Sequence, residues 1–345
     1  MFTDEKAATS GKPIPPLVIA KPAHPISRQD IDPDALKIIY RLHGHGFIAY
    51  VTGGAVRDLL LGKPVNDFDI VTDARPGQIK KRFHNAYIIG RRFRLAHLHF
   101  RDGKVIEVAT FRRAADSAAE TACEIGSPPP SPYGTPAEDA FRRDITINAL
   151  YYDAITETVI DYVGGLEDVA RRAVRVIGDP PERFKEDPVR IWRVLRFAAR
   201  LGFAIDEPTL QAIPSHIHLL ADCAGARLFE EFNKDLTSET RPVVEALRKY
   251  GVLKHILGKL GEGYEAEESL YARLAALLES EDRGRTAGFE LSLAEMYALI
   301  FWPWMEPFLA DTKADLHKVL SDAFRNASIR MNIPRSLRAD VSQIL

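Results

Sequence analysis

The sequence GGAVRDLLLGKPVNDFD occupies residues 53–69 and follows an apolar run, FIAYV, at residues 47–51. Adjacent glycines between a strand and a helix let the backbone approach a phosphate closely. The helix that follows offers unpaired N–H groups and a partial positive charge at its first turn. A Gly-Gly pair alone is more often an ordinary turn, so the interpretation depends on the carboxylates that come after it.

Two carboxylates, Asp67 and Asp69, lie in DFDIVT at residues 67–72, whose apolar residues favour a strand over a turn. In a strand both side chains leave the same face, about 6.6 Å apart along the chain. Such a pair repels itself unless cations neutralise it. Two Mg²⁺ ions about 4 Å apart would do so and would clamp the attacking and leaving oxygens of a phosphoryl transfer. A turn or a capping pair is the alternative for a lone DxD segment.

A third carboxylate, Glu107, lies in KVIEVATFR at residues 104–112. Strand alternation places it on one face with Val105 and Ala109, and an acid among apolar neighbours is costly unless it is paired or bound to metal. A salt bridge to one of the many arginines is the alternative. A Gly-Gly turn, two aspartates and a strand-borne acid together resemble the nucleotidyltransferase superfamily.

The composition is that of an ordinary globular protein, with 46% hydrophobic and 27% charged residues. No apolar run reaches the ~18 residues of a membrane span, so we expect no membrane partner. Two distant cysteines, Cys123 and Cys223, and no signal layout at the N-terminus favour a cytoplasmic protein without a disulfide framework. The net charge is −2, yet residues 171–200 hold nine Arg or Lys and four Asp or Glu. This excess indicates a local phosphate-binding surface or a solvated helix face.

The apolar pattern divides the chain into a mixed N-terminal part and a helical C-terminal part. Strands are predicted at 47–51, 67–72, 86–90, 94–100 and 103–111, and helical periodicity dominates from about residue 180. We therefore expect an α+β fold with a small mixed sheet. The expected parts are a flexible tail at 1–28, a catalytic head at 29–155, a neck at 156–235 and an RNA-binding helical body at 236–345. The Pro-rich segment 113–137 predicts a long loop.

Further motifs occur in order before residue 203. They are RRD at 142–144, DYVGG at 161–165, EDPVR at 186–190 and RVLRFAARLGF at 193–203. With GGAVRD and DFD, they resemble the class II RNA nucleotidyltransferases, which are bacterial poly(A) polymerases and CCA-adding enzymes. The resemblance covers about residues 25–340. It implies a polymerase-beta-like head followed by a helical neck and body.

The resemblance also implies which residues carry out the reaction. Asp67, Asp69 and Glu107 would be catalytic and would hold two Mg²⁺ ions. The 3′ hydroxyl of an RNA would attack the α-phosphorus of ATP in line, with release of pyrophosphate. The residues expected to bind the nucleotide are Gly53, Gly54, Arg57, Arg112, Arg142, Arg143, Asp144, Asn148, Asp187, Arg190, Arg193 and Arg196.

The residue types suit these roles. Arg142 and Arg143 can offer forked donors to triphosphate oxygens or ribose hydroxyls. On an ideal helix beginning near Glu186, the arginines of this segment form one stripe. Asp187 lies beside Arg190 on that wheel, and the resemblance implies that the two read the edge of the adenine base. Outside the family context, a salt bridge between them is the simpler interpretation.

Three stretches resemble the poly(A) polymerase branch. They are the lead-in HPISRQDIDPDALKIIYRLHGHGF at 24–47, GRRFRLAH at 90–97 and ARLFEE at 226–231. We therefore expect a template-independent polynucleotide adenylyltransferase that acts on RNA 3′ ends in mRNA polyadenylation. The alternatives are a CCA-adding tRNA nucleotidyltransferase, a small-molecule nucleotidyltransferase and, more remotely, a non-catalytic RNA-binding protein. Nothing in the sequence indicates a protein partner.

Three other features bear on these expectations. Poly(A) polymerases of this group usually carry a basic C-terminal region, and this sequence ends at Leu345 without one, so we expect weaker and more salt-sensitive RNA binding. His97 and His99 share one strand face, but a zinc site lacks a third ligand in the sequence nearby. Trp302-Pro303-Trp304 predicts a helix break packed in the body.

Overall fold

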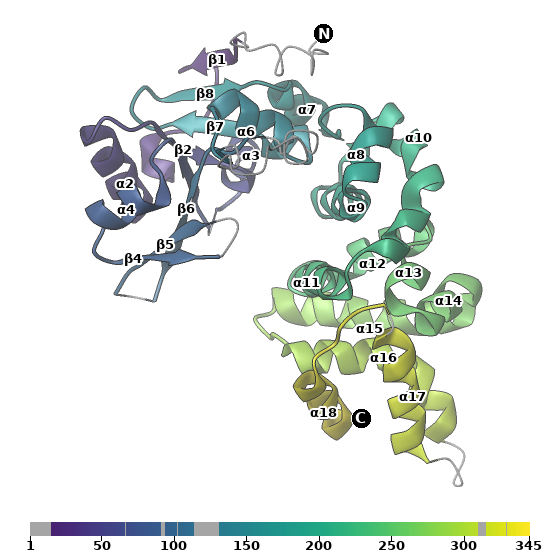
Figure 1. Ribbon diagram of the computed structural model, residues 1–345. Coiled ribbons are helices and arrows are strands. Elements are labelled where there is room, and N and C mark those ends of the chain that lie inside the picture. Colours follow the sequence, from purple (N-terminus) through teal and green to yellow (C-terminus); the bar gives the residue numbers. More distant parts are fainter. Residues whose placement is uncertain are drawn as a thin grey trace, which may run out of the picture. The chain divides into compact units, whose positions relative to one another are not determined.

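The computed structural model describes residues 15–65, 67–90, 94–101, 103–113, 131–309, 315–328 and 330–345. The chain forms two compact units, Met1–Gly178 and Asp179–Leu345 (Figure 1). The described part of the first unit is a sheet with helices, and that of the second is helical apart from the short strand β10 (Ala204–Ile205). The predicted α+β class, with a mixed sheet followed by a helical part, is confirmed.

The described residues of the first unit form an eight-stranded sheet in the order β1-β8-β7-β2-β3-β6-β5-β4. Its strands are β1 (Leu17–Ala20), β2 (Ala49–Thr52), β3 (Asp69–Thr72), β4 (Ala86–Ile89), β5 (Leu95–His99), β6 (Val105–Thr110), β7 (Leu150–Asp153) and β8 (Thr158–Asp161). Neighbouring strands pair antiparallel except β3 and β6, which are parallel. All five predicted strands are present, within a sheet larger than expected.

Helices and short elements complete the first unit. They are η1 (Arg28–Asp30), α2 (Pro33–Gly44), α3 (Gly54–Leu60), α4 (Pro76–Arg82), α6 (Pro136–Arg142), η2 (Thr146–Asn148), α7 (Gly165–Arg171) and β9 (Ala173–Val174). Helix α2 begins at Asp32, whose carboxylate accepts the N–H groups of Asp34 and Ala35. Its apolar face contacts β2, and α4 contacts β4 and β5. These two helices therefore cover one face of the sheet.

The domain boundaries differ from those expected. Strand β1 pairs with β8, with Leu17 opposite Asp161, and Ile26 is fully buried. The described part of the expected tail therefore belongs to the sheet, while residues 1–14 lie outside the described residues. Strand β8 itself lies beyond the expected end of the head at 155, and the first unit continues to Gly178. Both errors have one cause, because two four-residue strands are specified by their mutual pairing and not by a local pattern.

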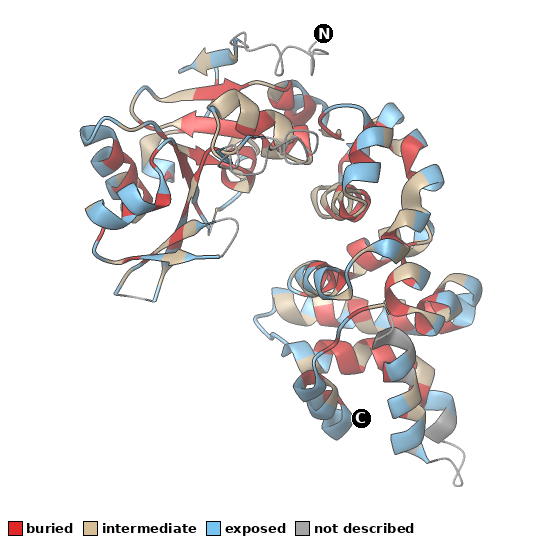
Figure 2. Ribbon diagram, in the orientation of Figure 1, coloured by how far each residue is buried: buried red, intermediate tan, exposed pale blue. Residues whose placement is uncertain are grey.

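The second unit consists of packed helices, as predicted. They are α8 (Pro180–Glu186), α9 (Val189–Leu201), α10 (Glu207–His216), η3 (Ile217–Asp222), α11 (Gly225–Asp235), α12 (Thr240–Lys249), α13 (Leu253–Leu257), α14 (Lys259–Ala266), α15 (Glu268–Thr286), α16 (Leu293–Leu309), α17 (Leu316–Ser328) and α18 (Arg335–Ile344). Buried residues lie on the strands and on the sides of helices that pack together (Figure 2). Helix α16 continues through Pro303, so the predicted break there is wrong. None of the described helices is long and apolar enough to cross a membrane.

The helix predicted to begin near Glu186 is divided in two. Helix α8 ends at Glu186, and α9 begins at Val189. Between them Asp187 has an extended backbone, with φ −152° and ψ 94°. The cause is Pro188, because a proline ring disfavours the helical conformation of the residue before it. Asp187 therefore does not lie on the helical wheel of Arg190.

Candidate active site

Two of the three predicted acidic residues, Asp69 and Glu107, are neighbours on one face of the sheet, and Asp67 lies just before β3. Asp67 and Asp69 flank the buried Phe68 and are themselves exposed. Ile70 pairs with Val108 in the parallel β3–β6 ladder. Because side chains alternate along a strand, the preceding residues, Asp69 and Glu107, are neighbours on the other face. The mutual electrostatic effect of these carboxylates supports this placement.

The pKa of Asp69 is raised to about 6. The largest cause is partial loss of water around its carboxylate, and the next is the negative charge of Glu107, with a smaller contribution from Asp67. Arg143 acts in the opposite direction. The residue remains open to solvent on one side although protein atoms crowd the carboxylate. A cation could therefore reach this group and would relieve the repulsion.

Among the described residues, Glu107 is paired with a histidine. Its Oε1 lies 3.2 Å from Nε2 of His97, directly opposite on β5. The rings of His97 and His99 are 6.5 Å apart. Within the described ranges, no three His, Cys, Asp or Glu side chains are arranged to enclose one ion. The acids nevertheless suit Mg²⁺, which is held by one or two carboxylates and completes its shell with water and substrate phosphates.

The glycine turn lies beside these acids. Gly53 has φ 74° and ψ −139°, a conformation that residues with a side chain rarely adopt. It precedes α3, and its N–H donates to the carbonyl of Leu150 on β7 at 3.3 Å. A Cβ placed on Gly53 would lie 3.6 Å from Nη1 of Arg143. The turn therefore brings the backbone close to a cationic side chain.

A hydrogen-bond network holds this turn in place. Arg57 is buried, and its Nε and Nη2 donate to the Asp58 carboxylate at 2.9 and 2.8 Å. Its Nη1 donates to the side-chain oxygen of Asn148 at 2.5 Å, and the Asn148 carbonyl accepts from Arg143 Nη1 at 2.9 Å. Asn148 thus connects Arg57 with Arg143. These contacts give Arg57 and Asn148 a role in positioning the turn.

Sequence reasoning missed a buried carboxylate, Asp139, that organises the arginines. One of its oxygens accepts from Arg142 Nε at 3.2 Å, and the other accepts from Arg143 Nε at 3.1 Å and the Tyr151 hydroxyl at 3.0 Å. The backbone N–H of Arg112 also donates to it, at 3.1 Å. Burial alone would raise the pKa of Asp139, but the two arginine charges lower it overall. Its spacing three and four residues before the arginines on α6 is the signal that could have revealed it.

Positive charge is concentrated next to these contacts. Burial, and next the charge of Arg142, lower the pKa of Arg112. Arg142 and Arg143 keep 32% and 20% of their side chains exposed, so both can reach a ligand. Asp144 follows directly and is half-buried. A crowded cationic group therefore adjoins the crowded anionic group, and Arg143 influences both.

The second unit holds the residues expected to recognise the base. Asp187 pairs with Arg227 at 2.5 Å, while Arg190 donates to Glu186 at 2.9 Å and to the Arg183 carbonyl at 2.8 Å. Asp187 and Arg190 therefore each contact a different charged side chain, Arg227 and Glu186 respectively.

The arginine stripe on α9 is largely neutralised by α11. Arg196 is 3% exposed and donates to Asp235 and, at 2.6 Å, to Glu231. Arg193 lies 3.5 Å from Glu231 and keeps a third of its side chain exposed. The expected nucleotide contact of Arg196 is wrong for this structure, because its donors are used inside the protein. A helical wheel could not show which part of the stripe packs inward.

Two segments singled out in the sequence are only partly described. Leu95, Ala96 and His97 of the 90–97 stretch lie on β5, whereas residues 91–93 are outside the described residues. The predicted loop at 113–137 ends in α6 from Pro136, and its residues 114–130 are likewise outside.

A glycine turn, two acids on neighbouring strands of a mixed sheet and a third acid just before one of these strands define a nucleotidyltransferase head. The family description "Poly A polymerase head domain" matches residues 49–175, and "Probable RNA and SrmB-binding site of polymerase A" matches residues 202–261. The chain belongs to the poly(A) polymerase and CCA-adding enzyme family of RNA nucleotidyltransferases.

Individual relatives fall in both branches. Poly(A) polymerase I of Salmonella typhi is 40% identical over 294 residues, covering 83% of this chain and 63% of that protein. A CCA-adding enzyme of Geobacillus stearothermophilus is 32% identical, covering 88% and 71%. A tRNA nucleotidyltransferase solved with a primer tRNA and an incoming ATP analog is 29% identical, with a TM-score of 0.62 and coverage of 89% and 83%. The chain thus spans just under two thirds of the Salmonella relative.

Proposed function

We propose that this protein is a template-independent polynucleotide adenylyltransferase that adds AMP from ATP to the 3′ end of RNA. The observation that carries the proposal is the pair of adjoining charge clusters, one anionic and one cationic, beside the glycine turn. Each cluster repels itself, and a nucleoside triphosphate with its divalent cations is complementary to both. The higher identity to a protein named poly(A) polymerase supports ATP as the nucleotide.

Asp67, Asp69 and Glu107 are proposed to hold two Mg²⁺ ions. When bound, the ions supply charge neutralisation at the phosphates and lower the pKa of the attacking hydroxyl. The protein itself contributes by fixing the positions of these carboxylates. The β3–β6 pairing fixes Asp69 beside Glu107, and His97 holds Glu107 from β5.

The arginines are proposed to bind the triphosphate. Asp139 on α6 fixes the Nε groups of Arg142 and Arg143, and both side chains stay partly exposed, so that phosphate oxygens can approach them. Gly53 lets the backbone approach closely because no side chain intervenes. Such preorganised donors lower the barrier mainly through positioning and electrostatics.

Adenine selection is proposed to lie with Asp187 and Arg190. Asp187 offers carboxylate oxygens held by Arg227 and by the N–H of Val189 at 3.2 Å, and Arg190 offers guanidinium donors held by Glu186. An acceptor beside a donor matches the amino group and ring nitrogen on one edge of adenine. Arg193, which stays partly exposed, remains a proposed nucleotide contact.

Primer extension with Mg²⁺ tests the proposal. A generic RNA and a transfer RNA lacking its terminal CCA each receive ATP alone, CTP alone or both. Long ladders with ATP alone on either RNA support a poly(A) polymerase. A stop after three nucleotides, on the transfer RNA only and dependent on CTP, would establish the CCA-adding alternative, with which the similarity to a solved tRNA nucleotidyltransferase is compatible. Asp69→Asn is the inactive control.

A further inference from the structure

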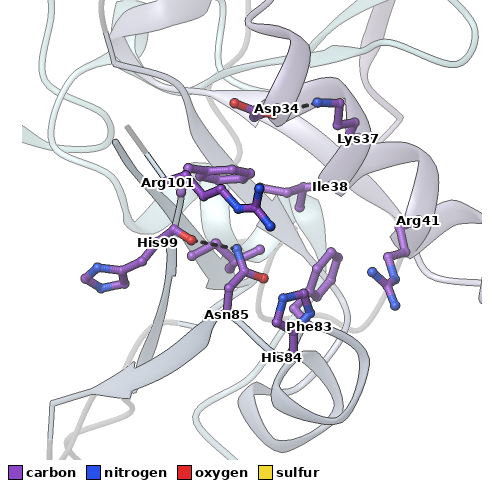
Figure 3. Close-up of a pocket in the computed structure, with 11 residues that line it drawn as sticks. Asp34, Lys37, Ile38, Arg41, Phe83, His84, Asn85, His99 and Arg101 are labelled. Carbon is purple, nitrogen blue, oxygen red and sulfur yellow. Dashed lines mark hydrogen bonds and ion pairs between the residues drawn. The ribbon is translucent and has the colours of Figure 1, made fainter. Parts of the chain in front are cut away.

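A cavity of about 570 Å³ lies in the first unit between α2, the connection from α4 to β4, and the end of β5 (Figure 3). Its floor is apolar and includes Ile38, Phe83 and Leu98, all buried. Lys37, Arg41 and Arg101 lie around it. Cavities of this size commonly bind ligands of a few hundred daltons or one unit of a polymer.

The cavity lies on the opposite face of the sheet from the acidic residues. Leu98 pairs with Ile106, whereas His97 pairs with Glu107 one position away. Because side chains alternate along a strand, Leu98 points to the face covered by helices and Glu107 to the other. The His99 imidazole points away from the cavity, and its carbonyl accepts from the Asn85 amide at 2.9 Å (Figure 3). A ligand in this cavity is therefore not the reacting nucleotide.

The lining carries excess positive charge. Asp34 is the one acid among the described lining residues, and both Lys37 and Lys104 bind it at 2.8 Å. The Arg41 guanidinium lies 5.1 Å above the Phe83 ring and has no carboxylate partner among the residues that the structure describes. The same holds for Arg101 within those ranges. Within the described ranges, two guanidinium groups beside an apolar floor thus have no carboxylate partner.

We propose that this cavity binds the phosphodiester backbone of RNA as a second contact site. The inference rests on the proposed RNA substrate, which supplies a polyanion to the same molecule. Arg41 and Lys37 are separated by one helical turn, so their long side chains can reach neighbouring phosphates. The Phe83 ring lies 5.1 Å from the Arg41 guanidinium carbon and so keeps an aromatic face beside a cation at the cavity. An acidic peptide would use the charges but has less need of an aromatic face, which suits a nucleobase.

The test measures RNA binding without ATP or Mg²⁺, so it does not depend on catalysis. Fluorescence anisotropy of a labelled oligoadenylate gives the Kd at several salt concentrations. For Arg41→Glu we expect Kd to rise about tenfold and the salt slope to fall by about one, because one phosphate contact is lost. Lys21→Glu is the control with the same change of charge, since Lys21 follows β1 in the same unit with 42% of its side chain exposed. Addition of one nucleotide at saturating RNA should be unchanged in Arg41→Glu.

Each outcome decides the proposal. An unchanged Kd and slope for Arg41→Glu would overturn it, and so would an equal loss in Lys21→Glu, which would reflect net charge alone. In a third outcome, AMP or inorganic phosphate binds more weakly to Arg41→Glu than to wild type, while oligoadenylate binds the two proteins equally. The cavity would then be a small-anion site, and the RNA proposal would fall. Weaker RNA binding with intact nucleotide addition supports the proposal, while a wild-type protein that adds no nucleotide contradicts only the function proposed above.

Discussion

Replacement of Asp139 by Asn should disturb the arginines of the proposed site and leave the acids that are proposed to hold the metal in place. Asp139 is 1% exposed and accepts four hydrogen bonds, two of them from guanidinium groups. Removing one partner of a fully buried ion pair costs about 3–5 kcal/mol. Here water can reach Arg142 and Arg143, which are 32% and 20% exposed, so we expect a loss of about 2–3 kcal/mol in the free energy of unfolding.

The same change should impair use of ATP more than it impairs folding. Without the carboxylate, the two guanidinium groups lose their fixed orientation, and a displacement of about 1 Å at a positioning group can cost about 100-fold in rate. We therefore expect kcat/KM for ATP to fall by about 30- to 100-fold in steady-state primer extension. Urea denaturation of the same preparation gives the stability.

A matched variant makes this prediction specific. Asp168 is also buried and binds an arginine, Arg175, at 2.8 Å, together with the Thr146 hydroxyl at 2.6 Å. Asp168→Asn should lose comparable stability and keep kcat/KM for ATP within about threefold, because no proposed triphosphate ligand is held by it. A folded Asp139→Asn protein with wild-type kcat/KM, or an equal catalytic loss in Asp168→Asn, would refute the reasoning.

Three further substitutions test other parts of the site. Asp69→Asn should abolish nucleotide addition. Because the pKa of Asp69 in the folded protein, about 6, exceeds the ordinary 3.8, ionisation of this carboxyl destabilises the metal-free fold as pH rises through 6. The variant should therefore have a higher Tm than wild type at pH 7.5, and the difference in Tm should shrink at pH 5. Equal melting differences at both pH values would contradict this. Arg190→Ala should reduce the preference for ATP over CTP more than the rate with either nucleotide, and unchanged selectivity in competition assays would remove its proposed role. Arg196→Met should lower the free energy of unfolding, measured by urea denaturation, by about 3–5 kcal/mol, because it leaves buried carboxylates unpaired. Arg193→Ala should lower it by about 1 kcal/mol or less, because a third of the Arg193 side chain is exposed. Similar losses in the two variants would contradict the burial argument.

The local features of the first unit could be predicted from the sequence. Strands β4, β5 and β6 follow apolar alternation in segments bounded by glycine or charged residues, which is local information. The strand assignment also placed Asp67 and Asp69 on one face. That Glu107 lies beside Asp69 required the β3–β6 register, which follows from tertiary pairing and not from either strand alone.

The errors share a dependence on distant partners. The expected place of Asp187 beside Arg190 on one helical wheel was wrong because Pro188 interrupts the helix, and Arg227, far along the chain, contacts the carboxylate. Arg196 was expected to contact a nucleotide because it lies in the stretch RVLRFAARLGF, which resembles a family motif. Asp235 and Glu231 on α11 reverse that expectation, since buried charges are tolerated when they are paired.

The charges of the proposed site also predict how the binding of Mg²⁺ and the binding of ATP affect each other. Asp69 and Glu107 repel each other, Arg112 and Arg142 repel each other, and Arg143 influences both groups. A divalent cation relieves the first repulsion and a triphosphate the second, and each ligand binds the other directly. Mg²⁺ and ATP should therefore strengthen each other's binding, by a coupling that is reciprocal. Calorimetric titration of ATP with and without Mg²⁺ measures this coupling, and Asp69→Asn should weaken it by removing one of the repelling charges. The measured quantity is the ratio of the ATP affinity with Mg²⁺ to the ATP affinity without Mg²⁺. An equal ratio in the variant and the wild-type protein would show that the coupling resides in the nucleotide alone. The acids would then have no part in binding the Mg²⁺ that accompanies ATP.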